Sequence, residues 1–156
     1  MNLYLRLLRI IFKILAAPRL TDPQEPTTLS FRAWLHDIDL NMHLNNARYL
    51  SWMDLGRIYM MGRAGVLTAG YKRGWMPVVG HIGIRYLKPV PTFARVTLTT
   101  QIEDIDEKYF YIKQSFEHKG RTVAVAKVKG VLVSKKEGVI APQRVLDVVR
   151  KKNPAL

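Results

Sequence analysis

The segment from Asn46 to about Gly65 restricts the folds open to this chain more than any other part of the sequence. One set of apolar residues recurs there at helical spacing, and a second set makes other faces of the same helix apolar. The first set is Tyr49, Trp52, Met53, Gly56 and Met60, and the second is Leu50, Leu55, Ile58, Tyr59 and Met61. A helix that is apolar on most sides is normally buried. The rest of the chain must therefore surround this helix.

The patterns that follow and precede this helix are mostly those of strands. Apolar residues alternate with polar ones, or cluster between turn signals, in five segments. These segments are residues 29–36, 76–87, 94–103, 108–117 and 121–134, and shorter helices are predicted over 65–74 and 142–150. The simplest way to bury one central helix is to wrap one sheet around it. We therefore predict an α+β fold in which an antiparallel sheet surrounds a long central helix.

Composition narrows the classes of function. The length of 156 residues suits one domain, and the absence of cysteine excludes a disulfide scaffold, a cysteine nucleophile and a thiolate metal site. Lys and Arg number 25 against 12 Asp and Glu, a net charge of +13 that favours anionic partners. The basic residues are spread along the chain and form no familiar nucleic-acid motif. We therefore expect a lipid or thioester partner and no nucleic acid.

The first 17 residues differ in character from the rest. Arg6, Arg9 and Lys13 form one basic stripe on a helix that is otherwise apolar. A spanning helix needs roughly 20 apolar residues, more than this run provides. We expect a cytoplasmic protein that contacts the inner face of a membrane peripherally through residues 1–17. The alternative is a helix packed on the protein's own surface or on a partner subunit. Residues 18–28 are predicted to be a linker, and residues 29–156 the folded domain.

The link between the first strand and the central helix is unusually polar. Its residues 37–45 are called the motif loop below, and they are followed directly by Asn46. A helix that begins near Asn46 directs unpaired backbone N–H groups into this loop, which suits a developing oxyanion. A carboxylate there can orient water or attack a carbonyl. The alternative is that these Asp and Asn residues only cap the helix and close a turn.

The residues of this region resemble a known signature. The run Asp37-Ile38-Asp39-Leu40-Asn41-Met42-His43-Leu44-Asn45-Asn46-Ala47-Arg48-Tyr49 is similar to the Asp-x-Asp-x-x-x-His-x-Asn-Asn-x-x-Tyr pattern of hotdog-fold thioesterases. These include enzymes like 4-hydroxybenzoyl-CoA thioesterase and the acyl-carrier-protein thioesterases of plants. Tyr86-Leu87-Lys88-Pro89 also resembles a strand end of that family. The resemblance covers about residues 29–135 and implies a hotdog fold.

The resemblance also implies roles for individual residues. Asp39 matches the catalytic aspartate, and Asn41 and His43 match the polar residues that accompany it. Asn46 and Ala47 would offer backbone N–H groups to the thioester oxygen, and Tyr49 would line the site. Asp37 is the alternative for the key carboxylate, although the register favours Asp39. The plant branch has a further glutamate downstream, and this sequence has no acid between Asp54 and Glu103.

These matches imply hydrolysis of acyl-CoA, with a medium or long fatty acyl group, or of an acyl-carrier-protein thioester. They imply no cofactor and no metal, and a homodimer or a dimer of dimers. Two alternatives remain open. The first is an enoyl-thioester hydratase on the same fold, whose Asp-x-Asn-Pro-x-His pattern differs from this sequence. The second is a non-enzymatic protein that binds acyl lipids or membranes.

One residue pair and one histidine outside the motif carry weaker expectations. Asp54 and Arg57 are three positions apart on the helix, and a structural pair across one turn, or a dimer contact, is predicted for them rather than catalysis. His81 lies in a predicted strand between Gly80 and Gly83, and we expect it to be a structural histidine.

Overall fold

The computed structural model describes residues 3–151. The elements in chain order are α1 (Leu3–Ala16), β1 (Thr27–Arg32), a short 3-10 turn η1 (Leu35–Asp37), α2 (Asn46–Arg63), α3 (Val66–Arg73), β2 (Trp75–Tyr86), β3 (Arg95–Ile105), β4 (Phe110–His118), β5 (Arg121–Ser134), β6 (Gly138–Ile140) and α4 (Pro142–Lys151).

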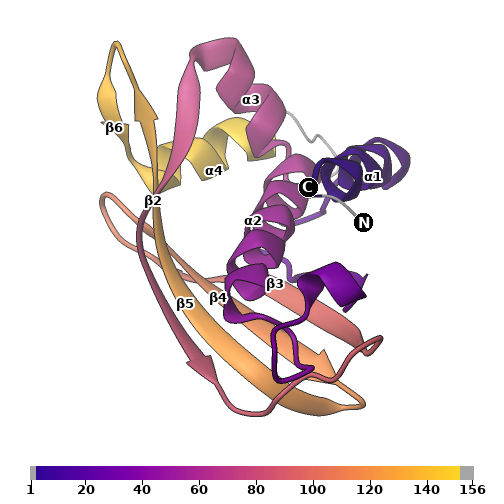
Figure 1. Ribbon diagram of the computed structural model, residues 1–156. Helices are drawn as coiled ribbons and strands as arrows, with labels where there is room; N and C mark the ends of the chain where they lie inside the picture. Colours follow the sequence, from indigo (N-terminus) through magenta and orange to yellow (C-terminus); the bar gives the residue numbers. More distant parts are fainter. Residues whose placement is uncertain (1–2, 152–156) are drawn as a thin grey trace.

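The strands form one antiparallel sheet in the order β1-β3-β4-β5-β2, with β6 paired to β5. The sheet curls beneath α2, and the ends of β2 and β5 extend toward α3 and α4 (Figure 1). β1 and β2 are the two edge strands of this order. This arrangement confirms the predicted α+β hotdog class.

The core is the inner face of the sheet packed against α2. Asn45 caps the helix by accepting a hydrogen bond from the Ala47 N–H at 2.9 Å, and Gly65, with φ at 78°, follows its end. Trp52 and Met53 are fully buried, and Trp52 stacks on Phe31 of β1 with ring centroids 4.9 Å apart. The prediction of a buried central helix is therefore confirmed.

Several boundaries differ from the sequence-based prediction. β1 begins at Thr27, inside the predicted linker, and ends at Arg32 rather than at residue 36. It ends early because the chain turns into η1, which places Asp37 inside the protein. β6 was not predicted, since three residues are too few to show a periodic pattern.

The N-terminal helix α1 packs beside α2 (Figure 1). Its inner face buries Arg6 and Ile10, and Ile14 fits against Gly62, where an added Cβ would lie 2.6 Å from the Ile14 side chain. Packing on the protein's own surface, which was the alternative for residues 1–17, is therefore what the structure shows for this face. The outer face remains exposed and apolar, through Tyr4, Leu5, Leu8, Ile11, Phe12 and Leu15. Within residues 3–151, no helix has both the length and the apolar character needed to cross a membrane.

Candidate functional site

The motif loop is a closed, hydrogen-bonded structure between η1 and α2. Ile38 and Leu44 form an antiparallel bridge, and the Leu44 N–H donates to the Val90 carbonyl at 2.8 Å. At the base of the turn that follows, the Asp39 N–H donates to the His43 carbonyl at 2.8 Å. Met42 adopts φ of 60° to complete this reversal. The backbone geometry of the loop therefore holds Asp39 at its base.

The Asp39 carboxylate is half-buried and partly engaged by its own loop. Its Oδ1 accepts hydrogen bonds from the backbone N–H groups of Asn41 at 2.9 Å and His43 at 3.2 Å. No described residue donates to Oδ2. One oxygen thus fixes the carboxylate, and the other is available to a water molecule or to a substrate carbon.

Asn41 and His43 lie close to Asp39 along the chain, yet the side chains do not form a hydrogen-bonded triad. Asn41 is exposed, His43 is half-buried, and both meet Asp39 through backbone N–H groups. The structure describes no hydrogen bond between the side chains of these three residues. The three residues thus lie in one loop and are joined through backbone hydrogen bonds to the Asp39 carboxylate.

The two backbone donors predicted in the first turn of α2 differ in whether their N–H groups already have an acceptor. The Ala47 N–H is already used by the cap from Asn45. The Asn46 N–H has no acceptor among residues 3–151, and the Asn46 carbonyl accepts from the Tyr86 hydroxyl at 3.3 Å. Asn46 is therefore the backbone donor at this helix end that is free for a ligand oxygen.

Tyr49 is buried beneath two other aromatic rings. Its ring meets those of Tyr86 at 5.1 Å and Phe116 at 4.9 Å, both edge to face. Burial, with a smaller contribution from Tyr86, raises the pKa of Tyr49 to about 12, so its phenol stays protonated at neutral pH. In the sequence, Tyr86 stands only in the run that resembles a strand end of the family. Its contact with the start of α2 depends on the pairing of β2 with β5, which no local pattern reveals.

Asp37 has a different environment from Asp39. Its side chain is fully buried and receives both terminal nitrogens of Arg6, at 3.0 and 2.5 Å. A carboxylate enclosed in this way has no open oxygen for a substrate, which argues against the alternative assignment of the key carboxylate to Asp37.

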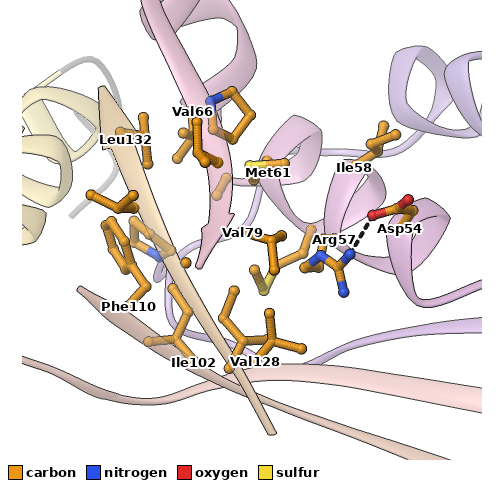
Figure 2. A pocket seen from close by; sticks show the side chains of 18 of the residues that line it. Asp54, Arg57, Ile58, Met61, Val66, Val79, Ile102, Phe110, Val128 and Leu132 are labelled. Carbon is orange, nitrogen blue, oxygen red and sulfur yellow. Dashed lines mark hydrogen bonds and ion pairs between the residues drawn. The ribbon is translucent and has the colours of Figure 1, made fainter. Parts of the chain in front are cut away.

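A cavity of about 330 Å³ lies farther along α2, between that helix, β2 and β5. Figure 2 shows aliphatic and aromatic side chains around it, including Met61, Val79, Phe110 and Leu132. None of the motif-loop residues lines it. The cavity and the motif loop are therefore separate features of the single chain.

Asp54 and Arg57 stand at one side of this cavity, joined by the predicted ion pair (Figure 2). Arg57 is buried, which lowers the pKa of its guanidinium, and it also donates to Gln114 Oε1 at 2.8 Å. Gln114 in turn donates to the Met53 carbonyl and to Thr100. The pair is thus part of a network that ties α2 to the sheet, as its structural interpretation predicted. His81 is exposed on β2.

The chain is similar in sequence to a known protein family and to individual proteins. Residues 33–152 match the model of the thioesterase-like superfamily. Protein THEM6 of Danio rerio is 39% identical over 88 residues, which cover 56% of this chain and 44% of that relative. The chain thus matches less than half the length of this relative.

Solved structures share the fold. The probable thioesterase YbaW from Escherichia coli superposes with a TM-score of 0.72 at 22% identity, covering 78% of this chain and 94% of YbaW. The hypothetical protein SAV2348 from Staphylococcus aureus, solved in complex with CoA, gives 0.69 at 16% identity, covering 85% and 89%. Because the family model spans most of the chain, including the motif loop, α2 and the whole sheet after β1, this protein belongs to the thioesterase-like superfamily.

Proposed function

We propose that this protein hydrolyses acyl-CoA thioesters, with medium or long fatty acyl groups, to the free acid and CoA. The observation that carries the proposal is the state of the Asp39 carboxylate, whose Oδ1 is fixed by two backbone amides while Oδ2 accepts no hydrogen bond within residues 3–151. Membership of the thioesterase-like superfamily and the CoA bound to the Staphylococcus relative support it.

In this proposal, Asp39 acts on the thioester carbonyl in one of two ways. As a general base it takes a proton from water, whose oxygen adds to the carbonyl carbon. As a nucleophile it forms an anhydride that water then cleaves. In either case the carbonyl oxygen gains negative charge, which the free Asn46 N–H at the start of α2 stabilises. The C–S bond then breaks, and the thiolate of CoA takes up a proton.

The experiment that tests this function is a panel of acyl-CoA substrates of increasing chain length, with release of free thiol as the readout. We expect turnover that is specific for a range of acyl lengths. An acyl-carrier-protein thioester in the same assay would show whether the carrier protein is preferred to CoA. If no thioester releases thiol while vesicles or acyl lipids bind, the non-enzymatic alternative holds instead.

The apolar cavity is the proposed site for the acyl chain. Ala64 lines it from the end of α2, and a larger side chain there would fill part of the space. Each methylene excluded from the cavity costs about 0.8 kcal/mol of transfer free energy. Ala64→Phe is therefore expected to lower kcat/KM for long acyl-CoA by about tenfold or more relative to short acyl-CoA. The matched control is Ala141→Phe, at an exposed position outside the cavity. An unchanged chain-length profile for Ala64→Phe would remove the cavity from the acyl site.

The free edge of β2 supports a homodimer. This strand is 12 residues long, and Met76, Val78 and Val79 are exposed on it. A long apolar edge strand tends to pair with another strand. We propose that a second copy of the chain covers this edge. Solution scattering at micromolar concentration is expected to give the mass of a dimer or of a dimer of dimers, and Val78→Lys is expected to shift it toward the monomer. A monodisperse monomer for the unchanged protein would exclude this assembly.

The outer face of α1 supports peripheral membrane contact. Leu5, Leu8 and Phe12 are 57%, 50% and 63% exposed, and the net charge of +13 complements anionic lipid. Replacing all three by glutamine is expected to lower binding to anionic vesicles at least tenfold, because insertion of each apolar side chain contributes about 1 kcal/mol or more. The melting temperature should stay unchanged, since the three side chains are exposed. Tyr71→Gln, an exposed position on α3, is the control. Vesicle binding that survives the triple replacement would exclude this face.

A further inference from the structure

The buried ion pair between α1 and the motif loop is a feature that the proposed function does not explain. Arg6 lies 31 positions before Asp37, and both side chains are buried, with 4% and 0% exposed. Arg6 donates through one terminal nitrogen to Asp37 Oδ1 at 3.0 Å and through the other to Oδ2 at 2.5 Å. The two side chains thus form a bidentate pair that joins the N-terminal helix to the residue at which the motif loop begins.

Asp37 joins three parts of the chain through this carboxylate. Besides Arg6, Oδ2 accepts from the Trp34 N–H at 3.0 Å, and Arg48 of α2 lies 3.5 Å from Oδ1. The Asp37 carbonyl accepts from the N–H of Asn45, the N-cap of α2, at 2.9 Å. Asp37 therefore holds the start of the loop through its side chain and the end of the loop through its backbone.

The position of Asp39 depends on these two anchors. Asp39 lies two positions after Asp37 along the chain, a reach of at most about 7 Å. The bridge between Ile38 and Leu44 carries the constraint from the anchors to the base of the loop, where Asp39 bonds to His43. If Asp37 moved, the whole reversal that carries Asp39 would move with it.

Arg6 is the partner that keeps Asp37 in place. A buried carboxylate is stable only when it is paired and hydrogen-bonded. Arg48 is 36% exposed and more distant, and His36, 40% exposed, carries charge only when protonated. Arg6 is itself fixed, because its guanidinium lies 5.2 Å from the centre of the Trp52 ring and donates to the Arg32 carbonyl at 3.4 Å. Its planar fork matches both oxygens of the carboxylate.

We propose that Arg6 is a positioning residue for the reaction. It holds Asp37 in place, and Asp37 in turn holds the motif loop that carries Asp39. On this proposal α1 is part of the scaffold of the site as well as the face that meets the membrane. The inference rests on the proposed role of Asp39 and adds a residue from outside the sheet and central helix. Removal of residues 1–17 would leave the Asp37 carboxylate without its buried cation.

The test uses the full chain with the double variant Arg6→Met, Asp37→Asn, which removes both buried charges together. We expect kcat for acyl-CoA to fall between about tenfold and 10²-fold, because small displacements of a catalytic group have effects of this size. KM should stay within about threefold, since neither residue lines the apolar cavity. Amide hydrogen exchange at Asn45 and His43 should accelerate at least tenfold, while exchange at Val96 and Leu98 in the sheet stays unchanged.

Two further variants separate positioning from general stability. Arg6→Lys keeps the charge but not the bidentate fork, and is expected to give an intermediate loss of kcat. Arg144→Met removes an arginine of α4 from its exposed pair with Glu137 and is expected to leave kcat and loop exchange unchanged.

The outcomes distinguish this inference from the proposed function. If the unchanged protein hydrolyses no thioester, the proposed function fails, and hydrogen exchange in the motif loop alone decides whether Arg6 positions it. If the unchanged protein is active and the double variant keeps its kcat and its loop protection, the positioning role of Arg6 is wrong. Exchange that rises equally throughout the protein would also overturn the proposal, because it would reveal a stability effect without a local one.

Discussion

Replacing Asp39 by asparagine is expected to lower acyl-CoA turnover by about 10²–10⁴-fold, the contribution typical of a general base. The substitution keeps the size of the side chain and its Oδ1, which accepts the Asn41 and His43 amides in the native loop. Only the negative charge and the basicity of Oδ2 are lost. The melting temperature and acyl-CoA binding should therefore stay near those of the unchanged protein. Steady-state kinetics, thermal unfolding and a binding titration measure the three quantities.

This variant also separates catalysis from a purely structural role. Asparagine closes the same turn and caps as well as aspartate does. A protein in which Asp39 only shapes the loop would retain its turnover. Wild-type turnover in Asp39→Asn would therefore contradict the assignment. In that case Asp54, whose carboxylate is exposed at the side of the cavity, would be the next candidate.

Replacing Asp37 by asparagine should lower the free energy of unfolding. The change leaves the Arg6 guanidinium buried without its counter-charge, and breaking a buried ion pair in this way costs about 3–5 kcal/mol. For a chain of this length that loss corresponds to a fall in melting temperature of about 6–20 °C. Thermal and urea unfolding measure it. Asp147→Asn, at an exposed position on α4, is the matched control and should stay within about 0.5 kcal/mol of the unchanged protein.

The double variant Arg6→Met, Asp37→Asn tests the cause of this loss of stability. Because it leaves no uncompensated charge, it should be more stable than Asp37→Asn alone. A loss below about 1 kcal/mol for Asp37→Asn would mean that water reaches this pair in solution. It would also contradict the enclosed geometry that separates Asp37 from Asp39.

The parts of the fold that repeat along the chain were predictable from the sequence. The apolar faces of residues 46–65 predicted a buried helix, and the structure has α2 at Asn46–Arg63. Alternation and turn residues placed the main strands, because side chains of a half-buried strand point to opposite faces in turn. The polar run at residues 37–45 showed where a loop meets the start of a helix. These features depend on local spacing, which a sequence displays directly.

Tertiary structure decided which of several apolar or charged faces is used. The helix at residues 3–16 is apolar on both sides of its basic stripe, so its sequence does not show which side packs on α2. The structure buries Ile10 and Arg6 and leaves Phe12 exposed. It also gives the two aspartates of the motif different environments. Arg6, distant in sequence, encloses Asp37, whereas Asp39 keeps an open oxygen. The physical reason is that burial and charge pairing depend on distances in space, and no local pattern encodes them.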